Sequence, residues 1–234
     1  MPFPPSDFLD LSHAPGPAVD LLSDDNTPVW NALNGIAEAL DSSLDRHISQ
    51  AKVSPDAHLG KHVYLGPGTV VEAGATIKGP AWIGPDSTVR AGAYVRENVI
   101  AGANVMLGNS CEFKNCIIFD NGEIPHFNYV GDSILGYKAH LGAGVILSNV
   151  RLDRQNIQLA DPSNPDTKID TGLRKFGAIV GDRTEVGCNS VLSPGSILGP
   201  DCILYPGTHW HGVLDKNHIV KLRQSHEITE RRSD

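Results

Sequence analysis

Three basic residues recur at intervals of 18 along the middle of the chain. Lys78, Arg96 and Lys114 each directly follow an apolar residue. If the chain coils with that period, the three cations stack on one outer wall, where like charges about 5 Å apart repel each other. The spacing therefore predicts an anion site, and phosphate is the anion that such cations suit. The alternative is a solvated face with counter-charges such as Glu97 or Glu112 nearby.

A single histidine follows this basic row. His126 lies 12 residues after Lys114, in the segment Glu-Ile-Pro-His-Phe-Asn-Tyr. Taken alone, a histidine is more often structural or exposed than catalytic, although an ordinary pKa near ~6.5 suits proton transfer at neutral pH. Its place near the end of the row, where the repeat pattern of the chain breaks, favours a catalytic role.

A repeat of six residues organises the chain from residue 51. Stepping by six from Val53 meets only apolar residues as far as Phe119, and the residues two positions earlier are small or apolar. Residues i and i−2 share one face of a strand, and turns such as Gly66-Pro67-Gly68 separate the strands. Three such sides close a coil of 18 residues, so the pattern predicts a parallel β-helix of about seven coils.

Two segments interrupt the repeat. The first, residues 120–128, contains His126, and the register resumes at Tyr129. The second, residues 151–175, has polar, turn-forming residues at its centre, and its two sides, Arg151–Ala160 and Thr167–Lys175, could pair as a hairpin. Loops that leave a rigid scaffold often carry function, so we expect the second segment to act as a flap over a substrate.

The two ends of the chain lack the repeat. Thr27 suits an N-cap and Pro28 the first helical position, and apolar residues then recur at helical spacing as far as Ile48. We expect residues 1–50 to form a helical cap against the first coil, either as a solubilising end or as a partner contact. The β-helix then spans residues 51–212, and residues 213–234 form a C-terminal extension with a short strand or helix and a loose tail.

Composition argues against several classes of protein. The chain of 234 residues has a net charge of −8, so a broad nucleic-acid surface is not expected. It shows no signal-peptide pattern and no run of 18 apolar residues, which favours a cytoplasmic protein without a membrane span. The four cysteines lack zinc-site spacing, so reduced thiols and no metal are expected.

The residues after His126 carry a family resemblance. The element His-x-x-Tyr-x-Gly-Asp, with Gly142-Ala143-Gly144 downstream, resembles the acetyltransferase domain of the bifunctional N-acetylglucosamine-1-phosphate uridyltransferase and glucosamine-1-phosphate acetyltransferase. It is more similar still to the archaeal sugar-phosphate nucleotidyltransferases that share this domain. The resemblance covers roughly residues 51–212 and is much more specific than the hexapeptide pattern alone. It implies a left-handed β-helix, an exception to the usual crossover rule, and a homotrimer.

The resemblance also implies an activity. Members of this family transfer an acetyl group from acetyl-CoA to the amine of an amino-sugar 1-phosphate, without a metal. In this chain the amine would attack the thioester while a histidine accepts its proton, and N–H groups near Gly142-Ala143 would stabilise the oxyanion. The uridyltransferase half has no counterpart before residue 51, so a separate uridyltransferase is a possible partner.

Roles for single residues follow from the same resemblance. His126 matches the general base. Sugar-phosphate binding is assigned to Arg96, Lys114, Tyr129, His140 and Lys175, and the acetyl-CoA channel to Ala143, Asn149, Cys188 and Pro206. The family pattern is not complete, because His140 stands where the bifunctional enzyme has an asparagine and Val150 replaces an aromatic residue. The acceptor could therefore be glucosamine-1-phosphate, galactosamine-1-phosphate or another amino sugar.

Two other functions compete with acetyl transfer. A β-helical zinc carbonic anhydrase needs three converging histidines, and the close His-x4-His pair of that class is absent from the sequence. A non-catalytic subunit that binds a sugar nucleotide or serves as a scaffold would fit a chain without the nucleotidyltransferase half. Release of free CoA in the presence of amino-sugar phosphates separates these possibilities.

Overall fold

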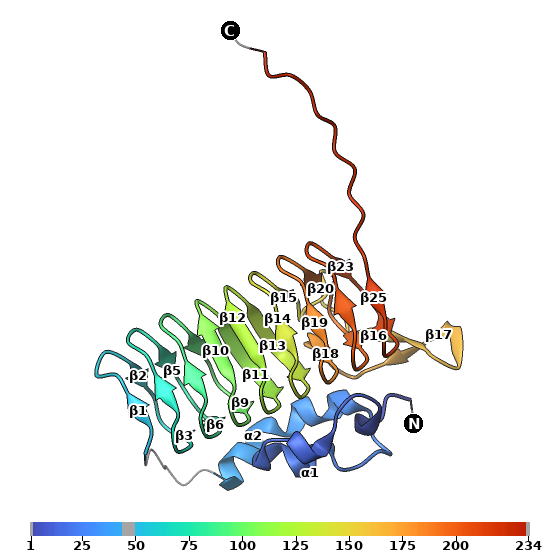
Figure 1. The fold of residues 1–234 in the computed structure, drawn as a ribbon. Helices are drawn as coiled ribbons and strands as arrows, with labels where there is room; N and C mark the ends of the chain where they lie inside the picture. Colours follow the sequence, from blue (N-terminus) through green and yellow to red (C-terminus); the bar gives the residue numbers. More distant parts are fainter. Residues whose placement is uncertain (1, 44–49, 233–234) are drawn as a thin grey trace.

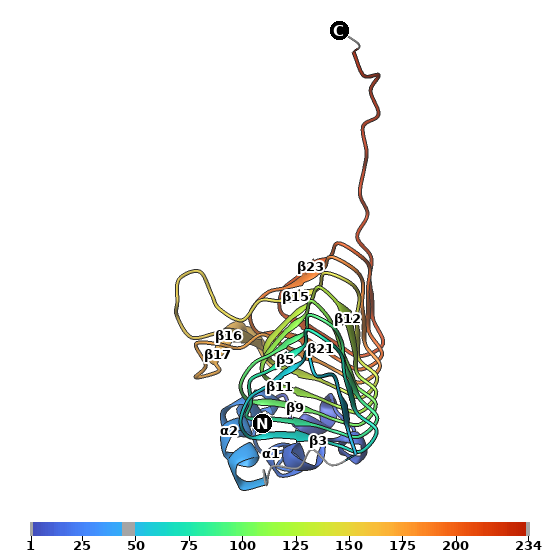
Figure 2. The ribbon, with the colours of Figure 1, turned by 90° about the vertical axis from the view of Figure 1, so that its left-hand side faces the viewer.

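The computed structural model describes residues 2–43 and 50–232, and most of them form a parallel β-helix (Figure 1). Short strands pair in parallel with strands one coil away and build a prism with three flat sides (Figure 2). The register repeats every 18 residues in the first coils, where Val71 lies beside Val89 and Ile77 beside Val95. The β-helix predicted from the six-residue repeat is confirmed.

We number the three sides in chain order. Side 1 consists of β1 (Lys52–Val53), β4 (Val70–Val71), β7 (Thr88–Val89), β10 (Met106–Asn109), β12 (Glu123–His126), β14 (His140–Leu141), β19 (Glu185–Val186), β22 (Ile203–Leu204) and β25 (Ile219–Val220). Side 2 consists of β2 (His58–Leu59), β5 (Thr76–Ile77), β8 (Tyr94–Val95), β11 (Glu112–Ile118), β13 (Tyr129–Leu135), β15 (Ile146–Leu147), β20 (Val191–Leu192) and β23 (His209–Trp210). Side 3 consists of β3 (Val63–Leu65), β6 (Ala81–Ile83), β9 (Val99–Ala101), the second halves of β11 and β13, β18 (Ala178–Val180), β21 (Ser196–Leu198) and β24 (Val213–Leu214).

The predicted first interruption is a regular part of the prism. Strand β12 lies within residues 120–128 and pairs in parallel with β10 and β14. The coil is one residue shorter than usual here, because Leu107 pairs with Ile124 and Phe113 with Val130. The six-residue count fails across this shorter coil although the structure continues.

The same shortening corrects two inward positions. Ile118 pairs with Ala101 and fills the prism interior, whereas Phe119, predicted to face inward, packs outside it. In the next coil Val130 is buried in the interior and Tyr129 faces outward. The sequence could not distinguish these neighbours by hydrophobicity, because both members of each pair can be buried.

The prism is longer than predicted. Side 1 holds nine strands, whereas the repeat suggested about seven coils. Strands β24 and β25 extend the prism to Val220, within the residues assigned to a C-terminal extension. Leu198 pairs with Leu214 in a coil two residues shorter than 18, which explains why the six-residue step lost the register after Trp210.

The N-terminal segment lies along side 3, not against the first coil as predicted (Figures 1 and 2). Its elements are η1 (Pro5–Asp7), η2 (Leu11–His13), η3 (Gly16–Ala18), α1 (Val19–Leu22), η4 (Val29–Asn31) and α2 (Ala32–Ser43). The outward residues of side 3 are apolar, and Ile100, Ile117 and Ile134 are completely buried beneath this segment. Hydrophobic burial therefore places the segment over the middle coils. The predicted helical residues Leu44 and Ile48 lie outside the described residues.

The long insertion forms a hairpin, as the sequence suggested. Strands β16 (Gln158–Asp161) and β17 (Asn164–Asp170) pair antiparallel. Ile157 and Leu159 are buried against the outside of the prism, so the base of the hairpin has a packing role that the sequence did not reveal. Residues 221–232 have no regular structure and lead away from the last coil (Figure 1).

Candidate functional site

His126 occupies the corner between sides 1 and 2, at the end of β12. We call the stacked residues of this corner, Asn109, His126, Ala143, Cys188 and Pro206, the corner column. The ladder of backbone hydrogen bonds that aligns them is continuous: Phe127 N–H donates to Asn109 O at 3.0 Å, Gly144 N–H to His126 O at 3.0 Å, Asn189 N–H to Ala143 O at 2.8 Å and Gly207 N–H to Cys188 O at 2.8 Å. The predicted base and three predicted acetyl-CoA residues therefore lie in one row.

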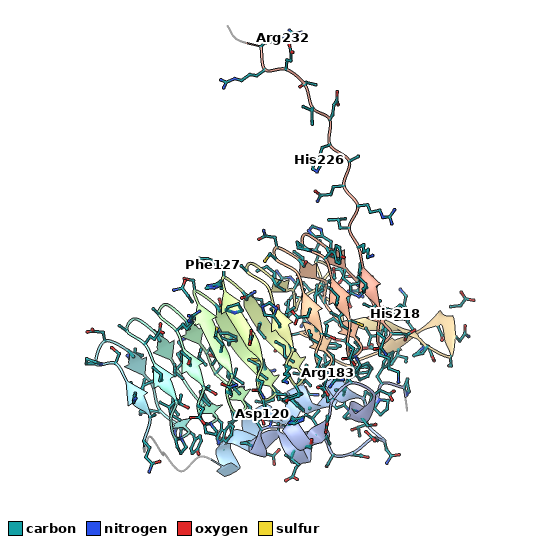
Figure 3. The ribbon with its side chains drawn as sticks, viewed as in Figure 1. Asp120, Phe127, Arg183, His218, His226 and Arg232 are labelled. Atoms are coloured by element: carbon teal, nitrogen blue, oxygen red, sulfur yellow. The ribbon has the colours of Figure 1, made fainter. Side chains whose placement is uncertain are left out.

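The His126 side chain is exposed at this corner. Its neighbour Phe127 is 61% exposed and, in Figure 3, projects from the edge of the prism opposite the N-terminal segment. The two rings lie 6.4 Å apart. An exposed imidazole on a rigid corner is accessible to a substrate, whereas a histidine in the core would be satisfied internally.

The buried side chain of Asn128 fixes this corner from the inside. Asn128 Oδ1 accepts the His126 N–H at 3.1 Å, and Asn128 Nδ2 donates to Gly142 O at 2.7 Å. The side chain also contacts Cys111, whose Sγ lies 3.4 Å from Oδ1. Burial raises the pKa of the Cys111 thiol, so this sulfur stays a neutral neighbour of the asparagine.

A second cluster surrounds the buried carboxylate of Asp132, where side 2 meets side 3. Lys114 Nζ donates to Asp132 Oδ1 at 3.1 Å, and Asn149 Nδ2 donates to Asp132 Oδ2 at 2.6 Å. Asn149 Nδ2 also lies 3.1 Å from the phenol oxygen of Tyr129. Three predicted site residues are thus brought together, and Asn149, assigned to acetyl-CoA, lies with the residues assigned to the sugar phosphate.

The phenol of Tyr129 lies close to the backbone of Gly131. A Cβ at Gly131 would lie 2.4 Å from the phenol oxygen, so any larger residue at this position would push the phenol away. Burial, followed by the nearby Asp132 carboxylate, raises the pKa of Tyr129 above its usual value. The phenol therefore remains protonated at neutral pH and can donate a hydrogen bond.

The basic row predicted from the 18-residue period exists, with counter-charges already beside it. Phe113 pairs with Val95, which places Lys114 beside Arg96 on the outer wall of side 2. Arg96 contacts Glu97 and Glu112, each at 3.0 Å. Lys78 lies over the ring of Tyr94 at 5.4 Å from its centroid. Carboxylates thus relieve the repulsion that motivated a phosphate site.

His140 lies on side 1, away from the Asp132 cluster. Its Nδ1 is 2.6 Å from the Glu185 carboxylate on the next strand of that side. A cavity of about 330 Å³ adjoins this pair and is lined by Gly142, Cys188 and Pro206 among others. Two predicted acetyl-CoA residues therefore open onto a largely apolar hollow beside the corner column.

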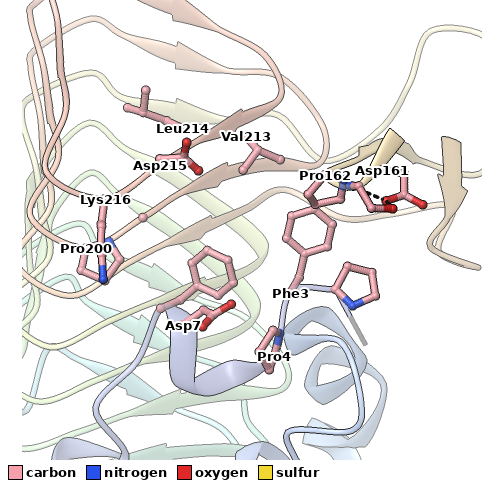
Figure 4. Close-up of a pocket in the computed structure, with 14 residues that line it drawn as sticks. Phe3, Pro4, Asp7, Asp161, Pro162, Pro200, Val213, Leu214, Asp215 and Lys216 are labelled. Atoms are coloured by element: carbon pink, nitrogen blue, oxygen red, sulfur yellow. Dashed lines mark hydrogen bonds between the residues drawn. The ribbon is translucent and has the colours of Figure 1, made fainter. Parts of the chain in front are cut away.

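Lys175 is exposed where the chain returns from the insertion to the prism. The adjacent Phe176 N–H donates to Asn149 O at 3.0 Å, which places Lys175 near the Asp132 cluster. The centre of the insertion does not share this location. Asp161 and Pro162 line a cavity of about 750 Å³ together with Phe3 (Figure 4). That cavity contains none of the predicted site residues.

The described residues contain neither a group of side chains suited to a metal ion nor a helix suited to spanning a membrane. In residues 2–43 and 50–232, no group of three or more His, Cys, Asp or Glu side chains could hold a metal ion. Over the same residues, no helix is long and apolar enough to cross a membrane.

Sequence reasoning missed three residues of the candidate site. Asn128 stacks on Cys111 at an inward position. Asp132 and Asn115 lie at the corner after Lys114, and Asn115 Nδ2 donates to Asp132 Oδ1 at 3.0 Å. Once Val130 is taken as the inward residue of its strand, Asn128 occupies the position two residues earlier, where the repeat otherwise has a small or apolar residue. That mismatch is the signal that could have identified it.

The chain is similar to several known proteins. A model of the GMPPB C-terminal domain family matches residues 77–162. The bifunctional protein GlmU of Methanococcus aeolicus is 32% identical over 188 residues, which cover 75% of this chain and 44% of that protein. The bifunctional sugar-1-phosphate nucleotidylyltransferase/acetyltransferase of Sulfurisphaera tokodaii is 30% identical over 178 residues, which cover 76% of this chain and 43% of that protein.

A solved structure shows a partial overlap. The acetyltransferase domain of PglB from Neisseria gonorrhoeae, in complex with acetyl coenzyme A, matches 73% of this chain and 53% of its own with a TM-score of 0.33 and 13% identity. The sequence relatives confirm the resemblance to bifunctional sugar-phosphate nucleotidyltransferase/acetyltransferases that the sequence predicted. The chain spans less than half the length of these two relatives.

Proposed function

We propose that the chain is an acetyl-CoA-dependent N-acetyltransferase whose acceptor is an amino-sugar 1-phosphate, with glucosamine-1-phosphate as the first candidate. The observation that carries the proposal is the corner column, in which exposed His126 is stacked on Ala143 beside an apolar hollow. Side 2, which begins at the same corner, supplies Tyr129 and Lys114. The names of the sequence relatives support transfer of an acetyl group in sugar-phosphate chemistry.

The proposed reaction needs a base and an oxyanion donor. The acceptor amine attacks the thioester carbonyl, a C–N bond forms, the C–S bond breaks, and His126 passes the amine proton to the departing CoA sulfur. The Gly142 N–H is already bonded to Val186 O at 2.7 Å. Among the described residues the Ala143 N–H has no hydrogen-bond acceptor, so we assign it to the developing oxyanion.

Acceptor binding is proposed for the wall of side 2. Arg96, Lys114 and Lys175 would hold the phosphate, with Tyr129 near the sugar. His140 lies on side 1 beside the hollow proposed for acetyl-CoA, so it is not part of this wall. The Arg96 guanidinium is shared with Glu97, which is partly exposed, and a dianionic phosphate could replace this carboxylate. Lys114 would act through its remaining N–H donors, because its pair with Asp132 is mostly buried.

The acetyl-CoA channel is proposed along the corner column. Ala143, Cys188 and Pro206 face the later coils, where the hollow beside His140 is lined mainly by apolar groups. An apolar channel suits the pantetheine arm, and it would bring the thioester to His126. Asn149 would lie where the two substrates meet, since it contacts Tyr129.

We propose assembly as a homotrimer because the site is open on a single prism. The proposed site residues lie on outer walls of one prism, and a neighbouring prism would supply the opposite wall. Side 3 is not available for this purpose along the coils that the N-terminal segment covers. Light scattering should give about three times the 25.0 kDa chain mass, and a monomer at micromolar concentration would contradict the assembly. A separate uridyltransferase is the proposed partner for the next chemical step.

The deciding experiment follows free CoA. Purified protein is incubated with acetyl-CoA and a panel of amino-sugar 1-phosphates, and products are identified by mass spectrometry. N-acetylglucosamine-1-phosphate, which has no free amine, is the matched control. We expect CoA release only with a free amine. No release with any amino sugar, combined with sugar-nucleotide binding, would instead favour a non-catalytic binding subunit.

A further inference from the structure

A cavity of about 780 Å³ lies beneath the first arm of the insertion, on side 2 of the later coils. Its walls include Val150, Arg151 and Leu152, and it is also lined by Lys168, Ser193 and His211. None of the roles proposed above uses it. The volume falls within the range typical of small-molecule sites, roughly 300–1,000 Å³.

The floor of this cavity continues the wall proposed to bind the acceptor. Lys114 pairs with Gly131, and the same column then passes through Ser148, Ser193 and His211, because Leu147 pairs with Leu192 and Leu192 with Trp210. With coils about 4.8 Å apart, Ser148 lies about 10 Å from Lys114. A ligand that starts at Lys114 therefore reaches the cavity without leaving side 2.

The wall above this floor is fixed by packing. Ile157 is 1% exposed and Leu159 2% exposed, and both pack against the outside of the prism. Thr171 Oγ1 donates to Ile157 O at 2.8 Å and closes the base of the hairpin. The cavity is therefore preformed, so little conformational entropy is lost when a ligand enters it.

The lining combines positive charge with apolar surface. Arg151 Nε donates to Asp153 Oδ1 at 2.9 Å, and both residues line the cavity. Lys168, on β17, has no ion-pair partner among the described residues. Leu152 is 102% exposed and adds apolar surface at the rim of the cavity. Cations suit phosphate groups, and apolar lining residues such as Val150 and Pro194 suit a base.

We infer that this cavity binds the nucleoside diphosphate part of a ligand of the acetyl-transfer site. Two ligands carry this chemistry: a nucleotide-linked amino sugar, and CoA, whose nucleotide end is adenosine 5′-diphosphate with a further 3′-phosphate. The continuous floor from Lys114 favours the first, so the acceptor site takes a nucleoside diphosphate amino sugar in addition to the amino-sugar 1-phosphate, with the sugar-linked phosphate in the same place in both. The identity of the acceptor rests on the proposed function, whereas occupation of the cavity does not.

Binding is tested first, without catalysis. Isothermal titration calorimetry with UDP, GDP, ADP and adenosine 3′,5′-bisphosphate compares wild type with Lys168→Ala. We expect at least one nucleotide to bind and to weaken roughly 10-fold in the variant, as for loss of one charge-assisted contact. Lys168→Arg should keep most of the affinity. The exposed Lys61→Ala, on the first coils, is the matched control and should bind as wild type. Absence of binding, or equal affinity in Lys168→Ala, would overturn the assignment.

Kinetics then separate the two sources. If the acceptor carries the nucleotide, Lys168→Ala lowers kcat/KM for UDP-glucosamine roughly 10-fold and leaves that for glucosamine-1-phosphate unchanged. If KM for acetyl-CoA rises instead, the cavity holds the end of CoA and the acceptor assignment is overturned. Lys168-dependent nucleotide binding without any acetyl transfer would refute the proposed function alone.

Discussion

The side-chain amide of Asn128 donates a 2.7 Å hydrogen bond to the carbonyl oxygen of Gly142 in the next coil of the prism. The same side chain accepts the His126 N–H, and the residue is only 3% exposed. One buried group thus connects the strand end that carries His126 to the turn that carries Ala143. An unsatisfied buried polar group costs about 1–3 kcal/mol, so this connection holds the corner in one arrangement.

Replacement of Asn128 should disturb catalysis beyond its effect on stability. Asn128→Ala leaves the His126 N–H and Gly142 O without their partner, and we expect a loss of about 1–3 kcal/mol of unfolding free energy. We also expect kcat to fall roughly 10-fold or more, because a small misplacement of a base is costly. Val145→Ala is the matched control, since Val145 stacks on Asn128 and is equally buried. Equal kcat in the two variants at comparable stability would make Asn128 purely structural.

Removal of the His126 imidazole should stop most turnover without unfolding the prism. We expect His126→Ala to lower kcat by roughly 10²–10⁴-fold, the usual range for loss of a general base. Its side chain is exposed, so circular dichroism and the melting temperature should change little. His140→Ala is the comparison, because that ring contacts Glu185 on side 1. Wild-type turnover in His126→Ala, with a loss in His140→Ala, would transfer the role to His140.

Arg96 should determine the preference for a phosphorylated acceptor. Wild type should use glucosamine-1-phosphate much better than glucosamine, and Arg96→Ala should reduce that ratio by roughly 10- to 100-fold. Glu97→Gln removes a competing carboxylate 3.0 Å from the guanidinium and should raise phosphate affinity. Lys114→Ala is a poorer probe, because it also leaves the buried Asp132 carboxylate without its cation. An unchanged preference for the phosphorylated acceptor in Arg96→Ala would mean that Arg96 only forms ion pairs with Glu97 and Glu112 and does not bind the phosphate.

The N-terminal segment should be needed for a stable prism. Trp30 is 2% exposed and its ring centroid lies 6.0 Å from that of Phe176, the first residue after the insertion. We expect Trp30→Ala to lower the unfolding free energy by about 3–5 kcal/mol, as for other large core truncations. Urea denaturation measures this loss. A change below about 1 kcal/mol would mean that the segment packs only loosely on side 3.

The sequence contained enough to predict the prism but not its whole length. A six-residue period is visible wherever each coil has 18 residues, because each of the three sides then places one apolar residue in the interior at a fixed spacing of six. It fails where a coil loses a residue, as between Leu107 and Ile124, and again after Trp210. At such points neighbours like Ile118 and Phe119 are both apolar, and only the strand pairing decides which one faces inward.

The placement of the N-terminal segment was harder to predict. On side 3 the outward residues alternate with the inward ones along each strand. Outward residues such as Ile100 and Ile117 are apolar as well, so these strands are apolar on both faces. A solenoid side that is apolar on both faces needs a cover, and this feature could have located the helices. The candidate site was more predictable, since a period of 18 placed Arg96 beside Lys114. Glu97 and Glu112, the carboxylate partners of Arg96, were expected from the sequence as counter-charges. Asp132 was missed although it lies 18 residues after Lys114 and pairs with it, so the same period could have identified it.

A pH-dependent contact should anchor the start of the N-terminal segment. Asp182 is 3% exposed, and its two carboxylate oxygens accept the Asp10 N–H at 2.7 Å and the Tyr137 N–H at 2.8 Å. Burial raises the pKa of Asp182 above its usual 3.8, and the nearby Asp10 carboxylate adds to the rise. Both hydrogen bonds and the nearby Arg183 act in the opposite direction and lower this pKa. The folded state therefore holds this proton more tightly than the unfolded state. The stability linked to this proton is fully present below about pH 3.8 and is lost as the pH rises through the folded pKa.

Comparison with Asp182→Asn isolates this group, because Asp10 and Arg183 are present in both proteins. We expect the unfolding free energy of wild type, relative to the variant, to increase as the pH falls from 7 toward 4. Urea denaturation at several pH values measures the difference. The asparagine amide has only one oxygen, so it can replace the acceptor for only one of the two backbone N–H groups. Hydrogen exchange at Asp10 or at Tyr137 should therefore be faster in the variant than in wild type at pH 7. A difference in unfolding free energy that shrinks as the pH falls would show that Asp182 is stabilised as a carboxylate, with its pKa lowered instead.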